Sequence, residues 1–388
     1  MSPNLMTVNK QIKPFYFDIT DDEIKYFLSE SEKILRSGKL ILGDHTKAFE
    51  QAFAEYVGTK YAIAVNSGSS GLEIILRLKK VEGTTVLVPT NTNFATIAMV
   101  IRAGGKVQYL DMDERTFAPS LKMVQEAVEK GKNLPEKISG VLWVHIGGVI
   151  SPEFPQVVEY CHQQGFFVLE DTAHAHGSQI NGVSAGNLGD GAAFSFFPTK
   201  VMTTCEGGMI TLNNEEEDYI ARSLRNQGKR GMDFGGLHTD FGNSMRITEI
   251  NAVLGRIHLA KLPEMLRKRQ QAYELITAPL KEAGLSFVST EKMDVASNYK
   301  LIVHLPDGIN PKEVKTALAE KGIFLGGTVY EIPCHQQPVF ESICEGQSFP
   351  GAERWCPNHI CPPLTSGTTE EDAQRVGEAL VDILSTLH

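Results

Sequence analysis

The sequence contains no apolar run of the roughly 18 residues that a membrane-spanning helix requires. Residues 1–13 lack both the apolar core and the small-residue cleavage site of a secretory signal, so we expect a cytoplasmic protein. Acidic residues (47) outnumber basic ones (37), and the net charge of −10 disfavours a nucleic-acid-binding surface. We therefore expect neither a membrane nor a nucleic acid as a partner.

Cysteine is also sparse, with 6 residues in 388 and no C-x-x-C pair. This usage argues against a disulfide framework, and the spacing matches no zinc motif. We expect each cysteine to be a small buried hydrophobic residue, and we expect no bound metal. The six are Cys161, Cys205, Cys334, Cys344, Cys356 and Cys361.

The distribution of apolar residues predicts two units. Between about residues 46 and 212, short apolar segments alternate with helical patterns, which predicts an α/β domain with a mostly parallel sheet covered on both faces. Residues 246–284 have the pattern of long helices broken at Pro263, and further strand and helix patterns follow up to residue 387. We therefore expect an N-terminal arm and large α/β domain over residues 1–245. Connecting helices and a smaller α+β domain should span residues 246–388.

Polar residues follow three of the predicted strands, where ligands of α/β sheets collect. The first group, Asn66-Ser-Gly-Ser-Ser-Gly71, opens a helix, and helix N-terminal N–H groups with serine hydroxyls can hold a phosphate. The segment matches neither a Walker sequence nor G-x-G-x-x-G. A well-capped turn is therefore the alternative interpretation of Gly68, Ser69 and Ser70.

The second group is Glu170-Asp171 with His174 and His176 just beyond. A carboxylate at the end of an apolar strand is costly without a hydrogen-bonding or cationic partner, and a protonated pyridine nitrogen is one candidate. The two histidines could instead bind a metal, but their spacing from the carboxylates matches no recognised metal motif.

The third group contains Lys200, which lies between an apolar strand and the glycine pair Gly207-Gly208. A desolvated lysine with a lowered pKa forms Schiff bases readily, whereas a surface lysine is the ordinary alternative. A phosphate anchor, an acid for a pyridine nitrogen and an amine for an aldehyde are the three features that pyridoxal 5′-phosphate (PLP) requires.

At this point the chain resembles the DegT/StrS family, the PLP-dependent aminotransferases of nucleotide-sugar biosynthesis. The resemblance runs from about Gly38 to the C-terminal helix and implies the fold type I architecture of aspartate aminotransferase. It rests on many short markers in one order: Gly43, Phe49-Glu50, Asn66-Ser-Gly-Ser69, Val88-Pro89, Gly105, Leu110-Asp111-Met-Asp113, Val144-His145, Glu170 to Gly177, Gly189-Asp190, Phe194-Ser195-Phe196, Lys200, Glu206-Gly-Gly208, Arg225-Asn226-Gln-Gly228 and Gly242-Asn-Ser-Met-Arg246.

The resemblance implies a role for each matching residue. Lys200 would form the Schiff base and shuttle the proton, and Asp171 would keep the pyridine nitrogen protonated. His174 would contact the phenolic oxygen of PLP, and Asn226 would reach the phosphate from a neighbouring subunit, which implies a homodimer with shared active sites. The other expected cofactor contacts are Gly68, Ser69, Ser70, Asn93 and Ser195. Tyr330 and His335 are expected to contact substrate.

One position departs from the family pattern. An aromatic ring usually lies over the cofactor four residues after the proline of Val88-Pro89, and here that residue is Asn93, followed by Phe94. No glycine or extra residue in the segment indicates a bulge. We therefore expect Asn93 to lie against the PLP ring and Phe94 to pack in the apolar core with Ile97 and Met99.

The resemblance implies transfer of an amino group, usually from glutamate, to a nucleotide-linked keto-sugar by a ping-pong mechanism. One alternative is the same chemistry on a keto-cyclitol or an aminohydroxybenzoate-type precursor, since residues 170–176 and 242–246 also resemble such enzymes. A sugar 3-dehydratase would carry histidine at the position of Lys200. A regulatory homologue without catalysis would need damaged chemistry or an added recognition domain, and the sequence has neither.

Overall fold

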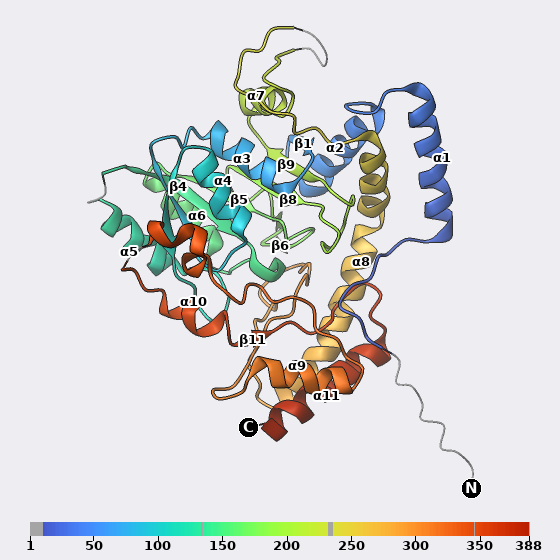
Figure 1. The fold of residues 1–388 in the computed structure, drawn as a ribbon, viewed down its shortest axis with the longest axis vertical. Helices are drawn as coiled ribbons and strands as arrows, with labels where there is room; N and C mark the ends of the chain where they lie inside the picture. Colours follow the sequence, from blue (N-terminus) through green and yellow to red (C-terminus); the bar gives the residue numbers. More distant parts are fainter. Residues whose placement is uncertain (1–10, 133–134, 232–235, 345, 388) are drawn as a thin grey trace.

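The computed structural model describes residues 11–132, 135–231, 236–344 and 346–387 (Figure 1). A seven-stranded sheet lies at the centre of its larger part, in the order β1-β9-β8-β5-β4-β2-β3. Every neighbouring pair is parallel except the two pairs that β9 forms, which confirms the mostly parallel sheet. The strands are β1 (Tyr61–Val65), β2 (Thr85–Pro89), β3 (Lys106–Leu110), β4 (Ile138–Val144), β5 (Phe167–Asp171), β8 (Gly191–Ser195) and β9 (Gly208–Leu212).

Helices cover both faces of this sheet, so the strands are apolar on both sides. In β4, Leu142 packs in one hydrophobic cluster with side chains of α3 and α4, whereas Trp143 packs in another with those of α5 and α6. A third cluster joins the opposite side of β1, β8 and β9 to α2. The helices of this part are α1 (Asp21–Ser37), α2 (Asp44–Val57), α3 (Gly68–Leu78), α4 (Phe94–Arg102), α5 (Leu121–Gly131), α6 (Phe154–Gln163) and α7 (Glu215–Arg225).

One long helix, α8 (Glu249–Glu282), connects the two parts of the molecule (Figure 1). The predicted break at Pro263 is wrong, because the helix continues through it. A proline inside a helix costs about 3 kcal/mol. That cost is outweighed here by burial, since Leu262 and Leu266 pack under the sheet and Tyr273 and Ile276 pack in the C-terminal core.

The C-terminal part is a smaller α+β unit with its own hydrophobic cluster. It contains β10 (Val303–His304) paired with β11 (His359–Ile360), together with α9 (Pro311–Glu320), α10 (Pro350–Trp355) and α11 (Glu370–Leu387). Ile12 of the N-terminal arm also packs in this cluster and forms a bridge with Ile323. The domain boundary at residues 245 and 246 stays a prediction.

Short elements complete the described chain: η1 (Ile146–Gly148), β6 (Gln179–Ile180), β7 (Val183–Ser184), η2 (Cys334–Gln336) and η3 (Pro338–Ile343). Within the described residues, no helix is both long and apolar enough to cross a membrane. Five of the six free cysteines are buried as expected. Cys205 is exposed, so that prediction is wrong for it; it lies in a turn at φ 68° rather than in the core.

Candidate active site

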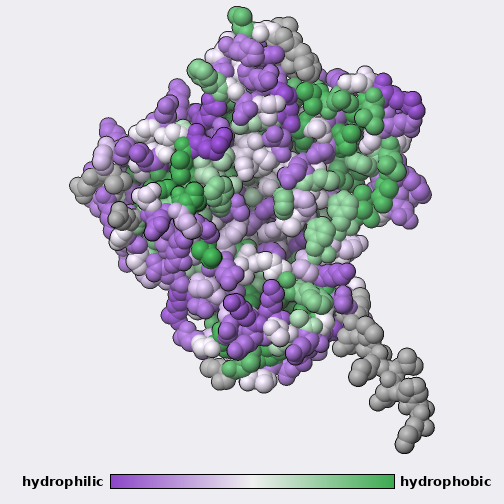
Figure 2. Space-filling model, viewed as in Figure 1, coloured by the Kyte–Doolittle hydropathy of each residue, from purple (hydrophilic) through white to green (hydrophobic). Residues whose placement is uncertain are grey.

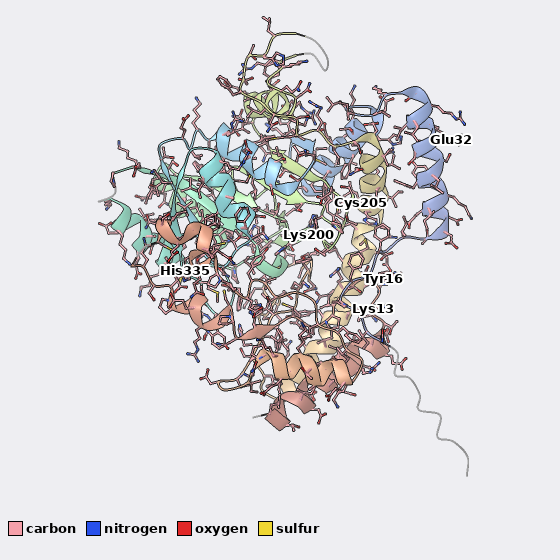
Figure 3. The ribbon with its side chains drawn as sticks, in the orientation of Figure 1. Lys13, Tyr16, Glu32, Lys200, Cys205 and His335 are labelled. Carbon is pink, nitrogen blue, oxygen red and sulfur yellow. The ribbon has the colours of Figure 1, made fainter. Side chains whose placement is uncertain are left out.

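A cavity of about 370 Å³ opens where β1, β5 and β8 end. It brings together residues from all three predicted polar groups, and Figure 3 places Lys200 just beyond the strand ends. Predicted site residues that line it are Gly68, Ser69, Asn93, Asp171, His174, Ser195, Lys200 and Tyr330. The segments meet there because the carboxyl ends of parallel strands share one edge of the sheet.

The first group forms the start of α3. Ser67 caps this helix by accepting a hydrogen bond from the backbone N–H of Ser70. Gly68 and Ser69 lie in the first turn, where backbone N–H groups have no partner within the helix. A Cβ atom on Gly68 would lie 2.8 Å from the Cβ atom of Ser195, so only glycine lets the helix start approach the end of β8 this closely. The result is a small concave group of donors suited to an anion.

Asp171 is the last residue of β5 and is buried. Its carboxylate accepts hydrogen bonds from the Thr96 hydroxyl at 2.8 Å and from the Ala173 N–H at 3.1 Å. Burial raises the pKa of Asp171 above its ordinary value, although these hydrogen bonds and the charge of Lys200 oppose the shift. The positive charge near the ionised carboxylate therefore does not offset its burial. A cationic group of a ligand would supply the missing charge.

Lys200 follows the end of β8 and projects into the same cavity. Burial lowers the pKa of its ammonium group to about 8, and the opposing attraction of Asp171 does not cancel this effect. Its Nζ atom lies 5.0 Å from the centroid of the Tyr299 ring. A lysine with this pKa is partly unprotonated near neutral pH, as a nucleophilic amine must be.

His174 is held in one orientation. The Gly147 N–H donates to its Nδ1 at 3.3 Å, and the ring stacks on Tyr299 with centroids 4.3 Å apart. Burial lowers the pKa of His174 well below its ordinary value, so the ring is neutral. Because Nδ1 accepts a hydrogen bond, the proton resides on Nε2, which lies 3.5 Å from the Tyr330 hydroxyl. His174 therefore offers a donor to the cavity.

The neighbouring charged residues have structural roles. Glu170 accepts hydrogen bonds from His145 and from the N–H groups of Gly186, Leu188 and Gly189. His176 is buried between Phe194 and Phe196, with ring centroids 5.6 and 5.8 Å away. Burial lowers the pKa of His176 to about 3. Glu170 and His176 are thus directed into the protein rather than toward a shared ligand site.

Asn93 lines the cavity, and its side chain caps α4 by accepting from the Ala95 N–H at 2.9 Å. Its contact with the cofactor ring stays a prediction. The expected burial of Phe94 is wrong: the side chain is 54% exposed and stacks on Phe340 with centroids 5.4 Å apart. Phe94 is the first residue of α4, and the core-facing side of this helix begins only at Thr96 and Ile97.

Three predicted residues lie outside the lining of this cavity. The hydroxyl of Ser70 bonds to the Asn66 side chain at 2.7 Å. His335 contacts the Thr90 hydroxyl at 2.7 Å and borders a different cavity. Asn226 caps the end of α7 and accepts a hydrogen bond from Arg246 at 2.8 Å. The roles expected for these three residues remain predictions.

Sequence reasoning missed several residues around the cavity. Thr96 donates a hydrogen bond to the carboxylate of Asp171, Tyr299 contacts both His174 and Lys200, and Glu206 lines the cavity. Glu206 could have been found from its place among the quoted markers. Thr96 and Tyr299 carry no local signal, because their contacts depend on segments far apart in the sequence.

Residues 21–381 match the model of the DegT/DnrJ/EryC1/StrS aminotransferase family. The chain belongs to this family. The fold confirms the expected fold type I architecture. The chain is a transaminase, and its family acts in sugar biosynthesis.

Individual relatives match over nearly the full length. A pleiotropic regulatory protein of Geobacillus stearothermophilus is 32% identical over 360 residues, covering 90% of this chain and 92% of its own length. A UDP-N-acetyl-3-dehydro-alpha-D-glucosamine 3-aminotransferase of Acidithiobacillus ferrooxidans is 29% identical, and 92% of each chain is covered. The solved aminotransferase TlmJ of Streptoalloteichus hindustanus is 25% identical with a TM-score of 0.86, covering 98% of this chain and 100% of that one.

The enzymes of this family depend on PLP, and the cavity of this chain fits that cofactor. The donors at the start of α3 suit its phosphate, and the tight contact of Gly68 with Ser195 keeps that space free of side chains. The buried Asp171 suits a pyridinium nitrogen, and Lys200 suits the aldehyde. The Nε2–H of His174 suits the phenolic oxygen.

Thr96→Val should lower the free energy of unfolding by about 1.5–3 kcal/mol, because it removes a hydrogen bond to a buried carboxylate. Chemical denaturation of the apoprotein, followed by circular dichroism, tests this. Thr96→Ser keeps the hydroxyl and is the matched control. Equal stability of the Val and Ser variants would show that the Thr96 hydroxyl does not support Asp171.

Proposed function

We propose that this family member transfers an amino group from glutamate to a nucleotide-linked keto-sugar by a ping-pong mechanism, with Lys200 as the residue that attaches PLP. The observation that carries the proposal is the convergence of Lys200, Asp171 and the anion-binding start of α3 on one cavity. The relative that acts on a UDP-linked 3-dehydro-sugar supports the choice of acceptor.

Bound PLP supplies an aldehyde and a ring that accepts electrons. Asp171 keeps the ring nitrogen protonated, and Thr96 and Ala173 hold its carboxylate in place. Lys200 would hold the aldehyde of the cofactor, and its amine could accept the proton from the donor's Cα atom, because burial lowers its pKa to about 8 and leaves part of it unprotonated near neutral pH. The Nε2–H of His174 would be a hydrogen-bond donor for the phenolic oxygen, because the Gly147 N–H holds the ring in one orientation through Nδ1.

The proposal includes a homodimer with shared active sites. Hydrophobic residues gather on the side of the molecule near α1 and α2 (Figure 2). On α1, Leu28 and Leu35 are 60% and 62% exposed, and Phe15 and Tyr16 of the arm are about half exposed. An exposed apolar surface of this kind marks an interface. Asn226 lies outside the cavity of its own chain, as expected for a residue that acts in the cavity of a second copy.

Mixing Lys200→Ala chains with Asn226→Asp chains should restore part of the activity that each variant lacks. A carboxylate at position 226 would repel the cofactor phosphate, yet it can still accept the hydrogen bond from Arg246. In a heterodimer, one of the two sites would contain both wild-type residues. Verified heterodimers without activity would instead indicate sites that are complete within one chain.

Product analysis tests the proposed reaction. The purified protein is incubated with PLP, glutamate and a panel of nucleotide-linked 3-keto and 4-keto sugars, and mass spectrometry detects the amino sugar and 2-oxoglutarate. Amination of one panel member supports the proposal. Amination of a keto-cyclitol or an aminohydroxybenzoate precursor instead would replace the acceptor, and absence of any amination would favour the regulatory role suggested by the name of one relative.

A further inference from the structure

A second lysine, Lys300, is partly buried and lies near the cavity, although it is not among the residues that line it. The backbone N–H of Lys300 donates to the carbonyl of Gly147, the residue whose own N–H holds His174. The Nζ atom of Lys300 lies 5.6 Å from the centroid of the Tyr299 ring, and that of Lys200 lies 5.0 Å from the same centroid. The two amino groups are therefore no farther apart than the sum of these distances, which places Lys300 within reach of a ligand attached near Lys200.

Lys300 has no acidic partner among the described residues. The charged or ionisable neighbours that affect it are the Cys361 thiol and the Arg269 guanidinium, and burial lowers its pKa. Arg269 is itself buried and donates to the carbonyl oxygens of Asn298 and Leu364, not to a carboxylate. The surroundings of Tyr299 thus contain three cationic groups, whereas Asp171 is the acid that faces Lys200.

This imbalance has an energetic cost that a ligand would relieve. A partly buried ammonium without a counter-charge loses part of its hydration and gains no ion pair in return. Such a group is stabilised when an anion binds beside it, because a charge-assisted hydrogen bond in a low-dielectric site is stronger than one in water. A bound anion would therefore stabilise the Lys300 ammonium, and the described residues of the free protein provide none.

Gly326 lies against this amine. A Cβ atom on Gly326 would lie 2.6 Å from the Nζ atom of Lys300, whereas a Cβ atom on Gly327 would meet nothing within 4 Å. Neither glycine has a backbone conformation that side chains avoid. The same loop leads to Tyr330, which lines the cavity. The side chain of Pro14 also lies 3.2 Å from the same Cβ position, so any side chain at residue 326 would crowd the Lys300 amine.

We propose that the Lys300 ammonium binds an anionic group of a reactant, either a carboxylate of the amino donor or a phosphate of the nucleotide-linked acceptor. The inference rests on the proposed function, because both anions belong to its reactants. Lys300 is thus a second cationic contact beside Lys200 and contributes to the choice of substrate rather than to proton transfer.

Two independent variants test this proposal. Lys300→Met removes the charge and keeps an apolar side chain to fill the space, and Gly326→Ala displaces the amine without removing it. Their matched controls are Lys292→Met, at an exposed lysine, and Gly327→Ala, whose added methyl meets no atom. Thermal unfolding and PLP absorbance confirm that each variant is folded and loaded.

Each half-reaction is followed separately by absorbance, first with a set of amino donors that includes glutamate and alanine, then with the accepted keto-sugar. We expect Lys300→Met and Gly326→Ala to raise the half-saturating concentration about tenfold to a hundredfold in one half-reaction, with a much smaller change in limiting rate. A change with the donor identifies a carboxylate, and a change with the acceptor identifies a phosphate. Calorimetric titration of the loaded protein with glutarate gives a readout without turnover for the carboxylate arm.

Unchanged half-saturating concentrations in both half-reactions, for both variants, would overturn the assignment of Lys300. This outcome is distinguishable from failure of the proposed function. If the proposed function were wrong, the wild-type protein itself would not react with any amino acid in the donor set. There would then be no wild-type value with which to compare the variants.

Discussion

Lys200→Ala is expected to abolish transamination and the visible absorbance of bound PLP while leaving the fold intact. Lys200 provides the amine within the cavity whose pKa, lowered to about 8, suits both attachment of an aldehyde and proton transfer at the donor's Cα atom. Loss of these roles should reduce turnover at least about a thousandfold. The measurements are the absorbance spectrum of the PLP-treated protein and the rate with glutamate.

Lys60→Ala, at an exposed lysine at the start of β1, is the control for removal of a lysine side chain. Circular dichroism and thermal unfolding of both variants separate loss of chemistry from loss of structure. Normal absorbance and normal turnover in Lys200→Ala would refute the assigned role of this residue.

Asp171→Asn is expected to retain PLP but to lose most activity, by about a hundredfold to a thousandfold. The amide has the shape of the carboxylate and can keep the contacts with Thr96 and Ala173, but it has no charge to stabilise a pyridinium. Breaking a buried ion pair on one side costs about 3–5 kcal/mol, of which the retained hydrogen bonds recover a part. Steady-state and single-turnover rates with glutamate measure the effect.

Asp190→Asn is the matched control for this variant. Its carboxylate accepts a hydrogen bond from the Val168 N–H at 2.7 Å, near the start of the same strand and away from the cavity. We expect its turnover to remain close to that of the wild-type protein. If Asp171→Asn and Asp190→Asn were equally active, Asp171 would have no special role.

The positions of Asp171 and Lys200 could be predicted because each follows an apolar strand, and parallel strands bring their carboxyl ends to one edge. The same alternation of strands and helices predicted the sheet. Thr96 could not be predicted, since it contacts Asp171 across 75 residues of sequence and the register of α4 against β5 decides the contact. The contacts of Tyr299 with His174 and Lys200 could not be predicted for a similar reason, because its segment follows α8, far along the chain.

Two errors show where local rules fail. Pro263 predicts a helix end, but α8 is buried against two separate cores, so packing outweighs the lost hydrogen bond. Phe94 predicts a core residue by hydrophobicity, yet at the first position of a helix its side chain points away from the buried face and rests on Phe340. In both cases the tertiary packing of the whole element decides, and a short sequence window does not contain that information.

Asn226 and His335 illustrate a different limit. Asn226 lies at the end of α7, outside the cavity of its own chain, so the cofactor contact predicted for it would require a second copy of the chain. His335 lies between Thr90 and Glu353 beside another cavity, so its expected contact with substrate depends on how far a bound nucleotide extends. The sequence pattern of one chain therefore predicts neither the assembly around Asn226 nor the extent of a bound nucleotide near His335.

The most direct test of the central claim is the location of the covalent link between protein and cofactor. The PLP-loaded protein is reduced with borohydride, digested, and mapped by mass spectrometry. We predict that the added mass resides on the peptide containing Lys200 and is absent from Lys200→Ala. Attachment to another lysine in the wild-type protein, such as the partly buried Lys300 beside Tyr299, would contradict the account.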